Sequence, residues 1–178
     1  MASLGHVAVG VALGRAWDAS AATRSRFGAS VLLSALALLP DADVIGLFAG
    51  IPYAHPLGHR GGSHSLLTAA GLAVTLAFLL RNVLPFGRTA LFALVALGSH
   101  GLLDALTDGG LGAALFWPLT AERYFAPVRP IPVAPIGPRI FSMYGLYVIG
   151  LEFVIFAPLI WYGLWPRSRE PARPPILR

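Results

Sequence analysis

The sequence contains no cysteine and no lysine, and it is poor in charge of either sign. Without cysteine there are no disulfides, no thiolate metal ligands and no cysteine nucleophile, so any metal must be bound by histidine or carboxylate side chains. All thirteen basic residues are arginines, and they form no dense basic run, so a nucleic-acid-binding face is not indicated. Because only 12% of the 178 residues are charged, each local cluster of charge is informative.

Apolar residues dominate the rest of the composition. They make up 56% of the chain, and the mean hydropathy of +0.71 is higher than a soluble domain carries. The sequence therefore predicts an integral membrane protein. Residues 1–16 lack the positively charged start of a signal peptide, so we expect them to form a retained helix.

The apolar runs predict an all-α fold, a polytopic membrane bundle of about five helices, some of them short, with a metal site at one membrane face. The expected helices cover residues 2–16, 27–39, 65–80, 89–106 and 140–165. The second should stop at Pro40, because proline cannot continue a hydrogen-bonded helix. Residues 111–139 are rich in proline and predict an extended loop. We expect one membrane domain over residues 1–165 and a flexible Arg/Pro-rich tail over 166–178.

Arginine is distributed unevenly between the two ends of these helices. If the five helices cross the bilayer alternately, one face receives nine arginines and the other only Arg60, Arg123, Arg129 and Arg139. By the positive-inside rule the first face is cytoplasmic, and the C-terminal tail lies there. This topology predicts a multi-pass inner-membrane protein.

The polar residues gather in two segments, 41–65 and 99–108. The first contains LPDAD and HRGGSH, and the second contains a histidine and an aspartate four residues apart, which project from one face of a helix. The predicted topology places both segments, with His6, at the non-cytoplasmic face. Neutral imidazoles and carboxylates bind zinc or a similar divalent ion, so we predict a centre of one or two zinc ions. The candidate ligands are His6, Asp41, His59, His64, His100 and Asp104.

Two residues of the same region are candidates for catalysis. Asp43 is the second carboxylate of LPDAD, and such a group can bridge metals or orient a histidine. The guanidinium of Arg60 suits a phosphate or carboxylate substrate. Simpler interpretations remain open: His100 could pair only with Asp104, and LPDAD could be only a helix stop.

Other polar residues fit structural roles better. For Glu152, in the middle of the last apolar run, we expect a hydrogen bond inside the bundle. No nucleophile-elbow sequence surrounds Ser63 or Ser65, so we expect them to cap the third helix. His55 is a weaker ligand candidate than the other histidines, and Asp108 is expected to be a helix-end residue.

Taken in order, an N-terminal histidine, LPDAD, HRGGSHS and SHGLLDALTDGG resemble the membrane-bound metal-dependent hydrolases, catalogued as LexA-binding, inner-membrane-associated hydrolases. The resemblance covers roughly residues 1–118, and the family generally has threonine where Ser63 stands. It implies distant similarity to zinc-dependent phospholipase C and P1 nuclease, whose ligands occur in an order similar to that of His6, Asp41, His59, His100 and Asp104. His64 and Asp43 belong to the membrane family's own motifs. The second HxxxD pair and the N-terminal tryptophan of a three-zinc site are missing. A regulatory protein partner is also implied by the resemblance.

The function predicted from these features is hydrolysis of a phosphoester, in a lipid or lipid-linked phosphate, by a water molecule that the metal activates. A metal or proton transporter that uses intramembrane His and Asp is one alternative, and it predicts ligands spread through the depth of the bundle. A non-catalytic scaffold stabilised by metal is another, and it predicts a closed coordination shell. The expected partners are the lipid bilayer and a lipid-like substrate.

Overall fold

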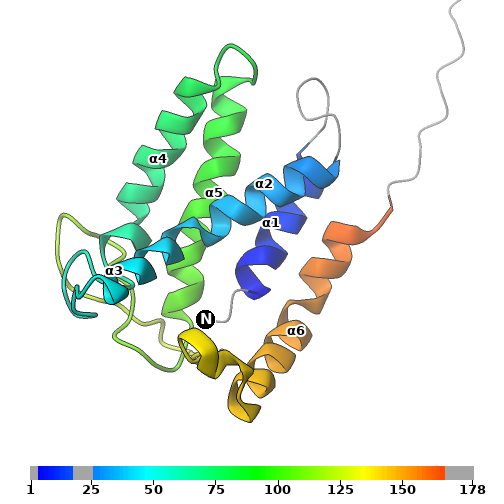
Figure 1. The fold of residues 1–178 in the computed structure, drawn as a ribbon. Coiled ribbons are helices and arrows are strands. Elements are labelled where there is room, and N and C mark those ends of the chain that lie inside the picture. Colours follow the sequence, from blue (N-terminus) through cyan, green and yellow to red (C-terminus); the bar gives the residue numbers. More distant parts are fainter. Residues whose placement is uncertain (1–3, 18–25, 167–178) are drawn as a thin grey trace, which may run out of the picture.

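The computed structural model describes residues 4–17 and 26–166, which form a bundle of α-helices (Figure 1). The longer helices are α1 (Leu4–Ala16), α2 (Arg26–Leu38), α4 (Leu66–Leu79), α5 (Phe86–Ala105) and α6 (Met143–Leu164). Between them lie the short α3 (Val44–Phe48) and three 3-10 turns, η1 (Leu39–Asp43), η2 (Gly62–His64) and η3 (Gly137–Phe141). The described residues contain isolated β-bridges but no strand. The predicted all-α class is confirmed. The predicted tail beyond Pro166 lies outside the described residues, as do loop residues 18–25.

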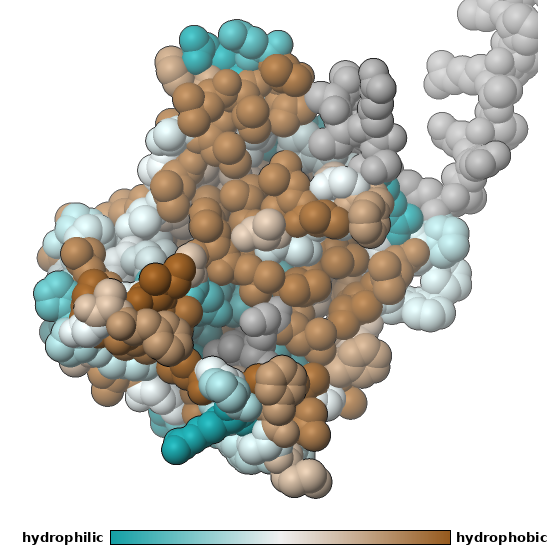
Figure 2. Space-filling view, in the orientation of Figure 1, coloured by the Kyte–Doolittle hydropathy of each residue, from teal (hydrophilic) through white to brown (hydrophobic). Residues whose placement is uncertain are grey.

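Three helical segments are long and apolar enough to cross a membrane: residues 26–48, α5 and α6, with 23, 20 and 22 residues. At about 1.5 Å per residue each is roughly 30 Å long, which matches the hydrocarbon core of a bilayer. The described parts of α1 and α4, with 13 and 14 residues, are shorter. Figure 2 shows a mostly hydrophobic surface over the visible helical body, with hydrophilic residues gathered toward its ends. The bundle therefore combines three helical segments that are long enough to span a bilayer with two shorter apolar helices.

The α-helix α2 ends at Leu38, just before Pro40, as predicted, but the chain does not enter an open loop there. The turn η1 continues the helical path from α2, and α3 follows at once, so the segment from residue 26 to 48 is unbroken. Pro40 lies in the first turn of η1, where its missing N–H removes no helical hydrogen bond. Asp41 and Asp43 therefore lie on a helical turn rather than in an open loop.

The centre of the bundle is α1, which packs against α2, α5 and α6. Its buried positions are occupied by small residues and one histidine. A Cβ atom on Gly10 or Gly14 would overlap the backbone of Ser34 or Ser30 on α2. Small residues let membrane helices approach closely, because packing rather than hydrophobicity drives their association within lipid. This close contact brings the start of α1 beside the end of α2.

Arginines mark one end of the bundle. Arg26, at the start of α2, donates to the carbonyl oxygens of Gly163 and Trp165 at the end of α6. Arg15, at the end of α1, donates to the same Trp165 carbonyl, and Arg88 near the start of α5 lies over the Trp17 ring. The opposite ends of α1, α2, α5 and α6 consequently meet at the other end of the bundle, and the predicted site residues lie there.

The proline-rich connection between α5 and α6 is extended, as predicted, and is held against the site end of the bundle. The Asp108 carboxylate accepts a hydrogen bond of 2.7 Å from the Val133 N–H, and the Asp108 N–H donates to the Ile131 carbonyl. The Tyr144 hydroxyl donates to the Val133 carbonyl at 3.3 Å. These bonds tie the connection both to the end of α5 and to the start of α6.

Candidate metal centre

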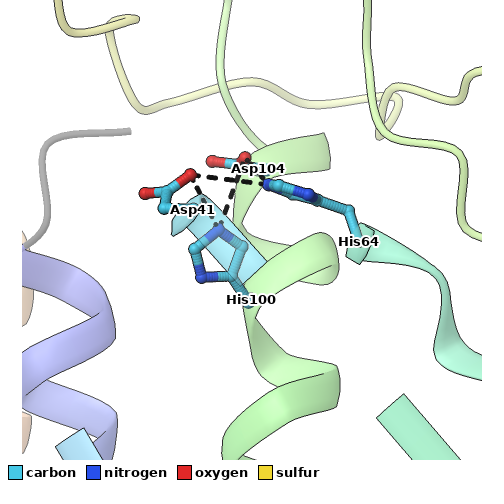
Figure 3. A group of neighbouring side chains, drawn as sticks. All are labelled: Asp41, His64, His100 and Asp104. Atoms are coloured by element: carbon cyan, nitrogen blue, oxygen red, sulfur yellow. Dashed lines mark ion pairs between the residues drawn. The ribbon is translucent and has the colours of Figure 1, made fainter. Parts of the chain in front are cut away.

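Four of the predicted ligands converge on one point, although they come from three separate parts of the chain (Figure 3). Asp41 lies on η1, His64 at the end of η2, and His100 with Asp104 one turn apart on α5. One ligand atom from each lies within 4.8 Å of all the others. A cluster of two imidazoles and two carboxylates is a donor set that suits zinc.

The individual distances fit an ion at the centre of this cluster. The His64 Nε2 atom lies 3.5 Å from Asp41 Oδ1 and 3.2 Å from Asp104 Oδ2. The His100 Nε2 atom lies 3.2 Å and 3.9 Å from the same two oxygens. Four ligands at about 2.1 Å from a tetrahedral ion are separated by roughly 3.4 Å. The observed separations therefore match the edges of such a tetrahedron.

The tautomer of His100 supports the same conclusion. Its Nδ1 atom lies 2.6 Å from the backbone carbonyl of Ala37, and a carbonyl can only accept, so Nδ1 must carry the proton. In the neutral ring the Nε2 atom then has only a lone pair, yet it faces the Asp41 carboxylate. That Nε2 atom is buried and forms no hydrogen bond among the described residues. Two acceptors that face each other inside a protein repel unless a cation or a proton lies between them.

His64 is oriented in a similar way. Its Nδ1 atom lies 3.2 Å from Asp43 Oδ2 and 3.0 Å from the Ser63 hydroxyl, which itself donates to Asp43. The Nδ1–H group is thereby directed away from the cluster, and Nε2 points into it. A carboxylate that holds the outer nitrogen of a histidine is the usual support for a metal-binding imidazole.

Without an ion, a proton takes the central place. Burial alone would lower the pKa of His64, but the neighbouring Asp104, Asp41 and Asp43 carboxylates outweigh it and raise the pKa to about 10. An ion and this proton compete for the same atom. The raised pKa of His64 therefore favours a proton among these carboxylates when no ion is bound.

Close packing of backbone brings His64 to α5. A Cβ atom at Gly101 would overlap the His64 carbonyl oxygen, so only glycine permits this approach. Gly101 directly follows His100, and the contact places the His64 ring beside that of His100, with centroids 4.6 Å apart. The glycine inside SHGLLD is therefore part of how the site is assembled.

His59 and Asp43 form a pair beside the four-residue cluster. The His59 Nδ1 atom lies 2.7 Å from Asp43 Oδ1 and 4.0 Å from Asp41 Oδ1. Together with His64, this pair forms a second group that could hold a metal. The short contact is already explained as an N–H···O hydrogen bond, so it requires no ion. His59 therefore belongs to the second group, which shares His64 with the first, and its ligand role stays a prediction.

His6 lies on the other side of the cluster. Its ring stacks on His100 with centroids 3.7 Å apart, and its Nε2 atom lies 4.0 Å from Asp104 Oδ1. Both ring nitrogens are buried and have no hydrogen bond among the described residues. A ligand role for His6 stays a prediction.

The N–H of Gly5, the residue before His6, donates to the buried Glu152 carboxylate at 3.4 Å. The predicted hydrogen bond of Glu152 inside the bundle is therefore confirmed.

Arg60 is almost fully buried and is held by groups at the end of α5. Its Nε atom lies 3.1 Å from Asp104 Oδ2, and its Nη2 atom donates to Asp104 Oδ1 at 3.4 Å. Its Nη1 atom donates to the Thr107 hydroxyl and to the Gly109 carbonyl. The residue has a positive φ of 63°, which is uncommon for a side chain of this size. Arg60 therefore positions Asp104 and partly neutralises it.

A cavity of about 400 Å³ opens beside the cluster. Its lining includes Val44 and the polar side chains of Asp41, Tyr53, His59 and Arg60. The rest is formed mainly by the connection between α5 and α6. Of the four converging residues only Asp41 borders the cavity, and its side chain is 29% exposed, against 1% or less for the others. The cluster is thus accessible from one side.

Several contributions could not be assigned from sequence. Arg123 donates to the carbonyls of His59, Tyr53 and His55, and so fixes the loop that carries His59. No sequence signal marks it. His55 itself is exposed, in line with its weak candidacy as a ligand.

Ser65 accepts hydrogen bonds from the N–H groups of Leu67 and Thr68 and caps α4 as predicted. Ser63 does not cap this helix, because its hydroxyl donates to Asp43.

The fold and the site define an α-helical membrane protein with a buried His/Asp cluster at one end of its bundle. Residues 1–170 match the family described as YdjM inner membrane protein, and the chain belongs to this family. It is 41% identical over 140 residues to the inner membrane protein YbcI of Escherichia coli (strain K12), which covers 75% of this chain and 81% of that protein. No solved structure matches the chain. The predicted inner-membrane location is confirmed, while hydrolase activity and similarity to phospholipase C and P1 nuclease stay predictions.

Proposed function

We propose that this protein is a metal-dependent hydrolase of the inner membrane that cleaves phosphoesters. One observation carries the proposal: of the four converging side chains, three are buried and only Asp41 is partly exposed and borders the cavity. The four protein donors already make a tetrahedral set, and catalytic zinc sites can expand to five ligands during the reaction, so a water molecule or a phosphoryl oxygen would enter as a fifth ligand from the Asp41 side. The one-sided access favours hydrolysis over a metal-stabilised scaffold.

The donor set supports the same chemistry. A divalent ion bound by Asp41, His64, His100 and Asp104 lowers the pKa of a water molecule toward neutrality and stabilises negative charge on phosphoryl oxygens. The chain contributes the orientation of these ligands, through Asp43 and the Ala37 carbonyl. Arg60 adds a fixed positive charge at the edge of the cavity.

We assign proton transfer to His59. Its ring borders the cavity, and with Nδ1–H bound to Asp43 the neutral ring carries its lone pair on Nε2. A histidine held in this way can take a proton from a group in the cavity or return it to a leaving oxygen. In this proposal His59 acts beside the metal rather than as its ligand.

The transporter alternative expects ligands throughout the depth of the bundle. The cluster instead lies where α2 and α5 end, at the end of the bundle opposite Arg15, Arg26 and Arg88. We propose that the arginine-rich end is cytoplasmic, in keeping with the positive-inside rule, and that the site faces the periplasmic side.

The test is to purify the full-length protein in detergent, measure bound metal by mass spectrometry, and assay hydrolysis of phosphodiesters and phospholipids. We expect His64→Ala and Asp104→Ala to lose both metal and hydrolysis, while His55→Ala, which changes an exposed histidine, retains both. Unchanged metal content in the two site variants would refute the site. Metal binding without turnover of any phosphoester would refute the assigned reaction.

A further inference from the structure

The cavity beside Asp41 has two chemically different walls. Charged and polar side chains, with Val44 among them, form the wall that includes Asp41, whereas the connection between α5 and α6 contributes an aliphatic wall of Val133, Ala134, Pro135, Ile136 and Ile140. We infer that this cavity binds an amphiphile, with an anionic phosphate-type head at the metal centre and an aliphatic portion along residues 133–140. The inference rests on the proposed function for the chemistry of the head group.

The aliphatic wall limits the class of ligand. A sugar phosphate or a nucleotide needs hydrogen-bonding partners for its hydroxyl groups or base, and the side chains of the far wall offer none. Free phosphate would fill only the space near Asp41, leaving the aliphatic side chains in contact with water. An alkyl group covers them instead, and each buried methylene contributes favourably.

The cavity is large enough for more than a phosphate. Its volume of about 400 Å³ is many times the roughly 30 Å³ that one water molecule occupies in the liquid, so an aliphatic chain of several carbon atoms fits beside the head group.

The wall is fixed in place rather than formed around a ligand. Val133 is bonded through its N–H to Asp108 and through its carbonyl to Tyr144, so it is tied to the ends of both neighbouring helices. A preformed wall reduces the ordering cost of binding. Asp108, which accepts the hydrogen bond from Val133, follows the cluster residue Asp104 by four positions in the sequence. This bond therefore links the aliphatic wall to the part of the chain that carries the head-group site.

Alkylphosphonates test this inference, because they resemble phosphate monoesters but have no ester bond to hydrolyse. We would titrate methyl-, butyl-, octyl- and dodecylphosphonate into the metal-loaded full-length protein by calorimetry. A fully buried methylene contributes up to about 0.8 kcal/mol, which is about fourfold in affinity. We expect binding roughly two- to fourfold tighter per added methylene while the chain lies along residues 133–140, and a smaller gain per methylene once it extends beyond them.

Two substitutions locate the effect on the aliphatic wall. Ala134→Trp should fill the cavity and weaken octylphosphonate binding at least tenfold, with metal content unchanged, while Leu119→Trp, at an 80% exposed position away from the cavity, should have no effect. If Ala134→Trp loses metal, the Ile136→Ser variant provides the test instead. It should weaken the binding of octylphosphonate but not that of methylphosphonate. Affinity independent of chain length, or an unchanged chain-length dependence in both wall variants, would overturn the inference and leave the proposed hydrolase intact. If binding depends on chain length and the wall variants abolish this dependence, the aliphatic subsite is supported. This holds even if no phosphoester is cleaved, and in that case only the hydrolase proposal fails.

Discussion

His100 and Ala37 are 63 positions apart in the chain, yet the imidazole Nδ1 of the first donates to the carbonyl of the second at 2.6 Å. This bond joins α5 to the last turn of α2, just before Asp41. It fixes the tautomer of His100 and leaves Nε2 facing Asp41. The carbonyl of an alanine, which no sequence motif marks, thus decides which nitrogen of the histidine is available to metal.

The first prediction concerns this histidine. His100→Ala should abolish metal binding, because it removes one of four donors and leaves Asp41 and Asp104 facing each other. Metal content measured by mass spectrometry on the purified variant is the test. His55→Ala is the matched control, since His55 is exposed and should leave the metal in place. Equal loss in both variants would point to general unfolding.

A second prediction separates His59 from the metal ligands. His59→Gln should retain metal, because the ring is paired with Asp43 beside the four-residue cluster. Turnover should fall by about 10²- to 10⁴-fold, the usual contribution of a proton-transfer residue. The measurement is metal content and hydrolysis rate on the same preparation. Loss of metal with His59→Gln would restore this residue to the ligand set, as the sequence predicts.

A third prediction follows from the charge of the metal-free site. The pKa of His64 is raised from 6.5 to about 10, so at pH 7 the metal-free protein holds a proton that an ion must displace. Stabilisation by that proton is fully present below pH 6.5 and is lost as the pH rises through 10. Metal binding at pH 7 should release about one proton, and affinity should rise about tenfold per pH unit between pH 6.5 and 9.

Calorimetry in two buffers of different ionisation enthalpy measures this proton release. In His64→Ala the release should disappear together with most of the affinity. An affinity that does not depend on pH in the wild-type protein would show that His64 is neutral before metal arrives.

A fourth prediction tests the close approach at Gly101. Gly101→Ala would place a methyl group against the His64 carbonyl, so His64 must move and metal affinity should fall at least tenfold. We expect a loss of about 1–3 kcal/mol in stability, as for other overpacked positions. Gly71→Ala in α4 is the control, because nothing lies within 4 Å of the added methyl. That change should alter stability by no more than about 1 kcal/mol and leave metal affinity unchanged.

The fifth prediction concerns orientation, and the absence of cysteine makes it easy to test. A single cysteine at the exposed Ala121, at the site end of the bundle, should react with an impermeant maleimide added to cells with a permeabilised outer membrane. Asn82→Cys, in the turn between α4 and α5, should react only after lysis. The reverse pattern would place the metal centre on the cytoplasmic side.

Much of the fold could be predicted from sequence, because the bilayer imposes simple rules on a chain. Apolar runs must be helical in lipid, since no water satisfies their backbone groups, and the five predicted helices are present. The exception is the segment after α2. The α-helix ends before Pro40 as predicted, but a 3-10 turn accepts proline in its first positions and continues into α3.

The sequence by itself determined the membrane class and the residues of the cluster, because ionisable side chains are costly in an apolar chain and few are present. It placed His64, His100 and Asp104 in motifs whose spacing suits a metal. Only the tertiary structure paired His59 with Asp43 beside the four converging residues and turned the Arg60 side chain onto Asp104. It also brought residues 133–140 across the site. These relationships join residues dozens of positions apart, and they depend on helix packing and backbone hydrogen bonds that local sequence patterns do not encode.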